Sequence, residues 1–404
     1  MTLKIGILRE VKIPSDDRVA LTPKHCKYLQ EHFDIKVKVQ PSEVRAITNE
    51  EYSTAGIELN ENITDCDVII GVKEIDKHNI IPNKTYFFFS HTIKKQLYNQ
   101  QLLQNCLKNN IRLIDYELLK ENDVRIIGFG KFAGIVGAHE TLRTYFRLLL
   151  NKEIPAAFEL GTLAELYDYY KTLTLPPFKI VLTGNGNVAK GSLEVLRILN
   201  IPELSPEEFQ FFQTTDQPVF TQLKNEHLFV NKESGTYDRN EFHKYPERYK
   251  SVLSEDWNTD ILINGIYWHD KMPRLFEVED VNNPAFKMEV IGDVTCDIDG
   301  SVPITVEATE KMNPFFIYNK ETHQKDDINS FDTHKHIAVM SIDNLPTQLP
   351  IDASNSFGDI MVNKIIPELL REQSDIIENA TICKDGQLTQ KYNYLSDYVF
   401  ETVE

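Results

Sequence analysis

A glycine-rich turn between a strand pattern and a helix pattern constrains this 404-residue chain most. The apolar, β-branched run 178–183 leads into Gly184-x-Gly186-x-x-Ala189, and a helical pattern follows. The first glycine permits a tight turn, the second leaves room for a pyrophosphate beside the backbone, and the small third residue lets helix and strand pack closely. The helix N-terminus adds free N–H groups and a positive dipole end. The turn predicts a dinucleotide site, and an ordinary glycine turn is the alternative.

Short apolar runs that alternate with polar helical patterns predict an α/β fold. In the first third of the chain, helices are expected over Pro23–His32 and over residues 94–109. Strands and helices that alternate at this spacing are typical of a largely parallel sheet. The expected strands of this part are 3–8, 36–40, 68–72, 86–90 and 112–116.

The rest of the chain continues this pattern around the glycine turn. A helix is expected over 137–151, and 353–371 has the apolar spacing of a further helix. The polar, irregular segment 203–249 is expected to be an insertion in the second domain. The tail around 392–395 is expected to dock on the fold. Further strands are expected at 260–264, 290–294 and 337–342.

The order of these elements predicts two Rossmann-like domains with parallel sheets and an active-site cleft between them. Residues 1–150 and 346–404 would form a catalytic, substrate-binding domain. Residues 151–345 would form the dinucleotide-binding Rossmann domain. A length of 404 residues fits two such domains.

Composition excludes several classes of protein. No apolar run reaches the roughly 18 residues that cross a bilayer, and the N-terminus lacks a signal-peptide pattern. The five cysteines are odd in number and without CxxC spacing, so neither a disulfide framework nor a metal site is expected. A formal charge of −18 disfavours nucleic acid, because phosphates would be repelled. These features favour a cytoplasmic protein without membrane or nucleic-acid partners, either a monomer or a homodimer.

Two consecutive strand patterns end in titratable side chains. The run 68–72 ends at Lys73 and Glu74, and the run 86–90 ends at His91. A partly desolvated lysine has a lowered pKa that suits proton transfer, and a histidine titrates near neutrality. An incidental ion pair at a strand end and a capping or core histidine are the alternatives. Because parallel strands bring both groups to one edge of a sheet, Lys73 and His91 are the candidate catalytic residues.

Three further charged residues lie beside expected elements. Arg18 comes before the helix Pro23–His32, and its planar guanidinium could clamp a carboxylate. Glu117 follows the strand 112–116 and could hold a substrate ammonium. Asp343 follows the last strand of the second domain and could touch the nicotinamide ribose. Surface or capping roles are the alternative for all three.

The residue that would contact the adenosine ribose is ambiguous. An NAD site places a carboxylate about 20 residues beyond the glycine motif, at the tip of the second strand. If that strand ends at Leu204, the neutral Ser205 occupies the tip and would spare a 2′-phosphate from repulsion, which favours NADP(H). Glu207 and Glu208 lie close by and leave NAD(H) open.

Several motifs together resemble the alanine dehydrogenase/saccharopine dehydrogenase superfamily, and the resemblance covers most of the chain. They are Leu8-Arg9-Glu10 with the segment 17–23, Gly71-Val72-Lys73-Glu74, Phe89-Ser90-His91 and the segment 132–138. Within the superfamily the chain is most similar to lysine–ketoglutarate reductase and to L-lysine-forming saccharopine dehydrogenase. The stretches 183–191, 245–249, 263–268, 296–301 and 341–350 carry this similarity.

The resemblance implies an NAD(P)-dependent enzyme that acts on CH–NH bonds in lysine metabolism. Hydride would pass between the coenzyme and the imine that joins lysine and 2-oxoglutarate, so that saccharopine is formed or cleaved. Lys73 and His91 would be the acid/base pair, and Arg18, Glu74 and Glu117 would bind substrate. The cofactor-binding residues would be Gly184, Gly186, Asn187, Val188, Ser205, Ile266, Asp343 and Leu345.

Two other functions stay open at this point. One is a dehydrogenase of alanine or another small amino acid, which would share the fold and the coenzyme. The other is a non-catalytic nucleotide-binding protein, and the presence of both Lys73 and His91 argues against it.

Overall fold

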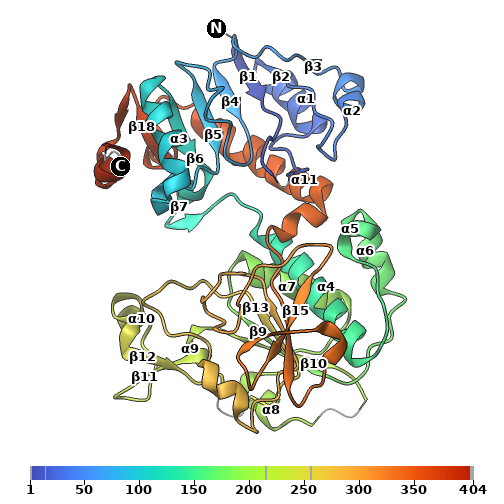
Figure 1. Cartoon of the computed structure of the whole chain (residues 1–404). Coiled ribbons are helices and arrows are strands. Elements are labelled where there is room, and N and C mark those ends of the chain that lie inside the picture. Colours follow the sequence, from blue (N-terminus) through green and yellow to red (C-terminus); the bar gives the residue numbers. More distant parts are fainter. Residues whose placement is uncertain (1, 14, 214–215, 255–256, 401–404) are drawn as a thin grey trace. The chain divides into compact units, whose positions relative to one another are not determined.

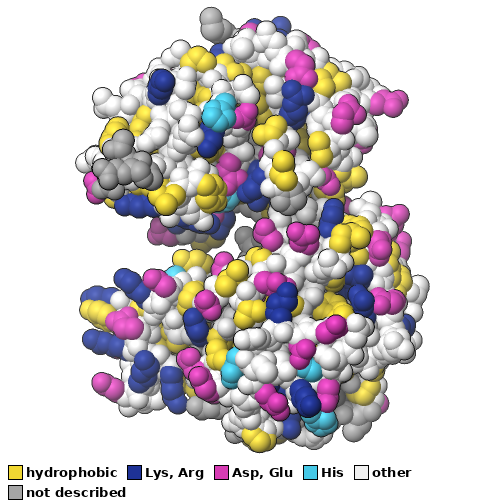
Figure 2. Space-filling view, viewed as in Figure 1, with side chains coloured by type: hydrophobic (Ala, Val, Ile, Leu, Met, Phe, Trp, Pro, Cys, Tyr) yellow, Lys and Arg dark blue, Asp and Glu magenta, His cyan; other side chains and the backbone are white. Residues whose placement is uncertain are grey.

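The structure is a computed structural model that describes residues 2–13, 15–213, 216–254 and 257–400. The chain divides into two compact units (Figure 1): Met1–Phe129 with Pro350–Glu404 form unit 1, and Gly130–Leu349 form unit 2. Each unit contains its own large, mostly parallel sheet. Figure 2 shows acidic and basic side chains interspersed over the visible face of each unit. The expected α/β class, with two Rossmann-like sheets, is confirmed.

Unit 1 is built on an eight-stranded sheet in the order β19-β18-β6-β5-β4-β1-β2-β3. Strands β1 to β6 run parallel, and β18 and β19 are antiparallel beside β6. The carboxyl ends of β1, β4, β5 and β6 therefore share one edge of the sheet. The strands are β1 (Leu3–Ile7), β2 (Ile35–Val39), β3 (Glu58–Leu59), β4 (Val68–Ile70), β5 (Thr85–Phe88), β6 (Arg112–Asp115), β18 (Thr381–Lys384) and β19 (Gln387–Leu388), with β7 (Lys120–Glu121) and β8 (Val124–Arg125) in a separate pair.

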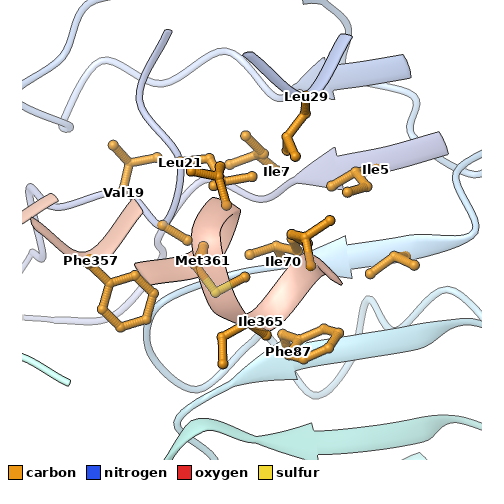
Figure 3. Close-up of a cluster of buried hydrophobic side chains, with 14 of the residues drawn as sticks. Ile5, Ile7, Val19, Leu21, Leu29, Ile70, Phe87, Phe357, Met361 and Ile365 are labelled. Atoms are coloured by element: carbon orange, nitrogen blue, oxygen red, sulfur yellow. The ribbon is translucent and has the colours of Figure 1, made fainter. Parts of the chain in front are cut away.

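A hydrophobic core lies between this sheet and a helix that returns from the C-terminal part of the chain. Figure 3 shows Phe357, Met361 and Ile365 of that helix in one buried cluster with Ile70 of β4 and Phe87 of β5. Burial of each such side chain stabilises the fold by about 1.5–3 kcal/mol. The cluster thereby fixes β4 and β5, and with them the residues that follow these strands.

The first helix of unit 1, α1, begins at residues that favour a helix N-terminus. Thr22 is the N-cap of α1, and Pro23 occupies the first helical position, where its missing N–H costs no hydrogen bond. The expected helix 353–371 is found as α11, a π-helical turn and α12. The tail docks as expected, because the side chain of Gln100 in α3 donates to the carbonyl oxygen of Tyr398 at 2.6 Å. The helices are α1 (Pro23–His32), α2 (Asn49–Thr54), α3 (Leu97–Lys108), α11 (Pro350–Ile360), the π turn (Met361–Ile365), α12 (Ile366–Leu369), α13 (Asp375–Ala380) and α14 (Ser396–Phe400).

Unit 2 has a seven-stranded sheet in the order β10-β9-β13-β14-β17-β15-β16. The five strands from β10 to β17 in this order are parallel, and β15 and β16 are antiparallel at the far edge. The strands are β9 (Lys179–Thr183), β10 (Val219–Leu223), β13 (Ile261–Asn264), β14 (Val290–Asp293), β15 (Phe315–Asn319), β16 (Gln324–Asp326) and β17 (His336–Met340). The helices are α4 (Gly130–Leu149), α5 (Ala157–Leu160), α6 (Leu163–Tyr170), α7 (Asn187–Ile198), α8 (Pro206–Phe211), α9 (Asn225–Leu228) and α10 (Arg239–Lys244).

The segment 203–249 is more regular than the sequence suggested, and the prediction of an irregular insertion was wrong in part. It contains β10, which pairs parallel with β9 in the main sheet. It also contains α8, α9, α10, the strand β11 (Phe229–Asn231) and the start of its partner β12 (Tyr249–Ser251). The apolar character of β10 is confined to five residues within polar sequence, so the pattern gave little signal.

The boundary between the compact units lies at residue 129, whereas the sequence placed a domain boundary at residue 150. The difference is α4, which packs closely on α7 of unit 2. A Cβ on Gly134 would lie 1.9 Å from the carbonyl oxygen of Val188, and a Cβ on Gly191 would lie 1.9 Å from that of Lys131. Only glycine permits this approach of two helices.

Three general features of the described residues bear on function. No helix among them is long and apolar enough to cross a membrane. In the same part of the chain, no group of three or more His, Cys, Asp or Glu side chains is arranged to hold a metal ion. The five cysteines are free thiols, and four of them are buried.

Candidate active site

Three adjacent parallel strands of unit 1 lead into the side chains that the sequence singled out. Lys73 and Glu74 follow β4, His91 follows β5, and Glu117 follows β6. Because β4 pairs with β5 and β5 with β6, these residues lie at one edge of the sheet. β4 and β5 end two residues earlier than expected, at Ile70 and Phe88, so Lys73 and His91 lie in the connections after these strands. The catalytic roles of these residues stay a prediction.

Glu74 and His91 form a hydrogen-bonded pair. One carboxylate oxygen of Glu74 lies 2.5 Å from Nδ1 of His91, and the other lies 3.1 Å from Nζ of Lys12. Burial opposes ionisation of Glu74, but the hydrogen bond from His91 and the charges of His91 and Lys12 outweigh it and lower the pKa of Glu74 to about 2. A carboxylate on Nδ1 fixes the orientation of the imidazole ring and leaves Nε2 for proton exchange.

Lys73 lines a cavity of about 250 Å³ together with Glu10 and Glu74. Burial and the charge of Arg18 lower the pKa of Lys73, which makes its neutral, proton-accepting form more accessible. The Glu10 carboxylate accepts the N–H groups of Val72 at 2.7 Å and of Lys73 at 2.9 Å. Burial nevertheless raises the pKa of Glu10 to about 7. Lys73, with a lowered pKa, and Glu10, with a raised pKa, therefore lie together after the end of β4.

Arg18 is buried, and its guanidinium is paired with Asp16. Nε lies 2.8 Å from one oxygen of Asp16, and an Nη lies 2.5 Å from the other, so the pair is bidentate. The guanidinium carbon also lies 4.0 Å from the centre of the Phe129 ring. Burial opposes ionisation of Asp16, but the hydrogen bonds and charge of Arg18 outweigh it and lower the pKa of Asp16 to about 2. A substrate carboxylate would have to share Arg18 with Asp16 or replace it.

Glu117 lies on a short 3-10 turn, Tyr116–Leu118, after β6. Its carboxylate oxygen is 3.6 Å from Nζ of Lys94 and 3.8 Å from an Nη of Arg125. Only 16% of the Glu117 side chain is exposed, whereas about half of each cation is. A substrate ammonium would compete with these two exposed cations for a shielded carboxylate.

The glycine turn of unit 2 has the shape that a pyrophosphate site requires. Gly184 has a left-handed φ of 91°, and a Cβ there would lie 2.7 Å from the carbonyl oxygen of Gly265. A Cβ on Gly186, in contrast, would meet no atom within 4 Å, so the space beside the N-terminus of α7 is open. An anion in that space can reach the free N–H groups of the first turn of α7. The residues present therefore fit a dinucleotide.

A buried hydrogen-bond network joins the ends of β9, β13 and β14 beside this turn. The hydroxyl of Thr183 donates to the side-chain oxygen of Asn264 at 2.7 Å, and the Asn264 amide donates to Asp293 at 2.9 Å. Asp293 also accepts from the hydroxyl of Thr305 at 2.7 Å, and burial raises the pKa of Asp293. Ile266 follows the end of β13 and is buried. The network fixes the loop that carries Ile266 next to the glycine turn.

The prediction for Ser205 rested on a strand end that the structure places elsewhere, and this part of the prediction was wrong. The strand beside β9 is β10, which ends at Leu223 and leads into Lys224. Ser205 is instead the N-cap of α8, where its hydroxyl oxygen accepts the N–H of Glu208 at 3.2 Å. The residue after the second strand is therefore a lysine.

The other predicted cofactor residues differ in exposure. Asn187 is exposed and Val188 is partly buried at the start of α7. Asp343 is exposed after β17, and its N–H donates to the carbonyl oxygen of Thr309 at 3.0 Å. Leu345 is buried, with its Cδ1 atom 3.4 Å from the place that a Cβ on Gly137 of α4 would occupy. Their contacts with a coenzyme stay a prediction.

Sequence reasoning missed three carboxylates in unit 1: Glu10, Asp16 and Asp115. Glu10 belongs to the motif Leu8-Arg9-Glu10, but the sequence does not show that it accepts backbone N–H groups of the segment that follows β4. Asp16 lies two residues before Arg18, and that spacing is a usable signal for a local pair. Asp115 stood inside an expected strand and gave no signal of its own.

Comparison with known proteins supports this fold. Residues 6–136 match the family model "Alanine dehydrogenase/PNT, N-terminal domain". The solved structure of an L-alanine dehydrogenase matches with a TM-score of 0.64 and 14% identity over 98% of this chain and 100% of that one. A transhydrogenase from Sinorhizobium meliloti matches with a TM-score of 0.60 and 15% identity over 95% of this chain and 99% of that one. These two structures show that the chain shares the fold of the L-alanine dehydrogenase.

Two curated relatives are more similar to this chain in sequence than these solved structures are. The chain is 36% identical to the mitochondrial alpha-aminoadipic semialdehyde synthase of Rattus norvegicus over 94% of its own length, but it spans only 46% of that protein. It is 25% identical to saccharopine dehydrogenase (NAD(+), L-lysine-forming) of Schizosaccharomyces pombe over 89% of this chain and 91% of that protein. The chain is thus similar to these relatives over most of its own length, and its residues 6–136 match the alanine dehydrogenase/PNT N-terminal domain.

Proposed function

We propose that this chain transfers hydride between a nicotinamide coenzyme and the imine that joins lysine to 2-oxoglutarate, so that saccharopine is formed or cleaved. The observation that carries the proposal is the set of proton-handling groups at one sheet edge, namely Lys73 and the Glu74–His91 pair. The open turn at Gly186 supports a coenzyme in the same chain. Relatives named for saccharopine and for alpha-aminoadipic semialdehyde support the substrate class.

The chain's own residues would manage the protons of this reaction. Lys73, with its lowered pKa, would take a proton from the lysine amine as that nitrogen attacks the keto carbon. His91 would give a proton to the keto oxygen as the carbinolamine forms. Lys73 would then pass the proton it took to that hydroxyl, which leaves as water and gives the protonated imine. Glu74 stays ionised and holds Nδ1 of His91 throughout. A coenzyme bound at the glycine turn would supply the hydride to the carbon of the protonated imine, which gives the secondary amine.

The substrate would be held by its charges. It carries carboxylates from both joined molecules and an ammonium group, so cationic and anionic partners are both needed. Arg18 would bind a carboxylate by sharing its guanidinium with Asp16, and Glu117 would bind the ammonium in competition with Lys94. A site for alanine would need to hold only one carboxylate.

We infer NADP(H) as the coenzyme, with NAD(H) as the competitor. Lys224, and not Ser205, is the residue that follows the strand beside β9. Leu223 of β10 pairs in register with Thr183 of β9, so Lys224 is level with Gly184 at the end of the neighbouring strand. A lysine at this position attracts the 2′-phosphate of NADP(H), whereas NAD sites usually carry a carboxylate there.

An omission assay tests the proposed reaction. NADPH or NADH oxidation would be followed with lysine and 2-oxoglutarate, leaving out each component in turn, and with pyruvate plus ammonia as the competing pair. We expect oxidation only when lysine and 2-oxoglutarate are both present. Turnover with pyruvate and ammonia would instead identify a small amino-acid dehydrogenase, and no turnover with any pair would favour a nucleotide-binding protein.

The proposed setting of the protein is a reducing compartment, and we propose the cytoplasm. The free cysteines support a reducing environment. The rat relative is named as mitochondrial, so cell fractionation has to distinguish these two compartments. We propose a monomer or a homodimer, which sedimentation would distinguish from larger assemblies.

A further inference from the structure

Asp115, the last residue of β6, is fully buried and binds the backbone of two candidate site segments. One of its carboxylate oxygens accepts the N–H of Ser90 at 2.9 Å and also the Ser90 hydroxyl, in a short hydrogen bond. The other oxygen accepts the N–H of Glu117 at 2.8 Å. Ser90 directly precedes His91, so a single side chain connects the segments that carry His91 and Glu117.

The backbone at His91 needs such support. His91 has φ 52° and ψ 11°, a left-handed conformation that costs energy for a residue with a side chain. The Ser90 hydroxyl also lies 2.8 Å from the hydroxyl of Thr92, so hydrogen bonds hold both neighbours of His91. Without them the segment would relax, and the imidazole would leave the geometry that its pair with Glu74 requires.

Only a carboxylate satisfies all three donors that converge here. An ionised carboxylate is an acceptor at both oxygens, whereas an asparagine of the same shape would turn an NH₂ group towards one of the donors. Within the described part of the chain, Asp115 takes part in no ion pair, and burial raises its pKa. A buried carboxylate without a cation is costly for stability, so a role beyond packing accounts for it.

We propose that Asp115 is a positioning residue that sets His91 in place for proton transfer and Glu117 in place to bind the substrate ammonium. This inference rests on the proposed function, because it concerns a group that would carry a proton and a group that would bind the substrate. It predicts that loss of Asp115 impairs proton-transfer steps specifically, while the coenzyme site of unit 2 keeps its affinity.

The test compares Asp115→Asn with a matched control, Asp260→Asn. Asp260 is also a shielded carboxylate with a raised pKa that accepts a backbone N–H, that of Lys179 at 2.7 Å, but it precedes β13 in unit 2. We expect Asp115→Asn to lower kcat about 100-fold, as a small misplacement of reacting groups does, with coenzyme Kd within about twofold of wild type. Asp260→Asn should lower thermal stability and leave kcat unchanged.

Isotope effects separate positioning from mere loss of folded protein. In Asp115→Asn the solvent deuterium effect on kcat should rise and the effect of deuterated coenzyme should fall, because proton transfer becomes slower than hydride transfer. A decrease in kcat that follows the folded fraction, with both isotope effects unchanged, would overturn the proposal.

Hydrogen exchange provides a readout that does not depend on turnover. Backbone amides of residues 89–92 and 116–119 should exchange faster in Asp115→Asn than in Asp260→Asn, while those of α3 stay protected. Equal exchange in the two variants would refute the role of Asp115. If wild-type protein gave no turnover with lysine and 2-oxoglutarate, the proposed reaction would fail, and the exchange experiment would still decide whether Asp115 holds these segments.

Discussion

The strand ends of the two sheets carry opposite kinds of chemistry. In unit 1 they lead into titratable side chains, and the pKa of Glu74 is lowered to about 2 while that of Glu10 is raised to about 7. In unit 2 the strand ends carry Thr183 and Asn264, each followed by a glycine, beside the buried carboxylate of Asp293. Proton transfer needs groups whose charge can change, whereas a diphosphate needs open backbone N–H groups. The comparison therefore supports the proposal that unit 1 carries the proton-transfer groups and that unit 2 binds the coenzyme.

This division of roles predicts that variants of unit 1 change the chemistry without changing coenzyme affinity. Lys73→Met and His91→Gln should each lower kcat by about 10²–10⁴-fold, the usual contribution of general acid–base catalysis. Coenzyme titration by fluorescence should give an unchanged Kd. Lys171→Met, at an exposed lysine, is the control for loss of a positive charge and should match wild type. Full turnover in His91→Gln would contradict the proposed proton transfer.

The buried ion pair of Asp16 and Arg18 should contribute more to the stability of unit 1 than its exposed ion pairs do. Asp16→Asn leaves the Arg18 cation without its bidentate partner and should cost about 3 kcal/mol in the free energy of unfolding, measured with denaturant. Because the pKa of Asp16 is lowered from 3.8 to about 2, the stability it contributes is present above pH 3.8 and is lost as the pH falls through 2. The variant should therefore lose less stability than wild type over that window. Identical acid profiles would show that the pair is not formed in solution.

A substitution at the glycine turn in unit 2 should weaken coenzyme binding without lowering the stability of the fold. A side chain at Gly186 would meet open space, so Gly186→Val should leave the melting temperature unchanged. It should nevertheless raise the coenzyme Kd by about 100-fold, because the side chain fills the space for the pyrophosphate. Gly184→Ala is the contrasting variant, since strain at φ 91° should lower stability as well. Normal coenzyme binding by Gly186→Val would rule out this turn as the diphosphate site.

Glu10 should give a pH dependence opposite in sign to that of Asp16. Its pKa is raised from 4.5 to about 7, so the stability associated with the protonated side chain is present below pH 4.5 and is lost as the pH rises through 7. The loss amounts to at most about 3 kcal/mol. Glu10→Gln cannot ionise and should flatten the stability profile between these pH values in urea unfolding experiments. A slope equal to that of wild type would show that Glu10 is ionised throughout.

The smallest expected effect concerns the choice of coenzyme. Lys224→Gln removes the cation at the end of β10 and should shift the ratio of kcat/KM for NADPH over NADH by about tenfold towards NADH. Lys232→Gln is a matched control, because its Nζ donates to the carbonyl oxygen of Glu247 away from this strand end. An unchanged ratio in Lys224→Gln would remove the present argument for NADP(H).

Features that depend on neighbouring residues were predicted well from the sequence, whereas features that depend on residues far apart in the chain were not. The positions of Lys73 and His91 just after two strands were predictable, because local apolar patterns show roughly where a parallel strand stops. The strand β10 was missed since its five residues stand within polar sequence, and Ser205 was assigned to the wrong position as a consequence. The close packing of α4 on α7 depends on Gly134 meeting Val188, a contact between residues far apart in the chain. Contacts of this kind leave no periodic signal.

The same limit applies to the candidate site. The pair of Glu74 with His91 could be expected from adjacent strands, but the hydrogen bonds of Glu10 to the backbone of Lys73 could not. Asp115 is the clearest case, because within the sequence it is an ordinary residue of a strand. Side chains that act by holding another segment are recognised only once that segment's position is known.

Transfer of deuterium from coenzyme to product would test the proposed chemistry most directly. The protein would be incubated with coenzyme deuterated at the reactive carbon of the nicotinamide, together with lysine and 2-oxoglutarate, and the product mass would be measured. We predict saccharopine one mass unit heavier than the product made with ordinary coenzyme, with the label on the carbon that had been the imine carbon. Unlabelled saccharopine, or deuterium found only in alanine when pyruvate and ammonia are supplied, would contradict it.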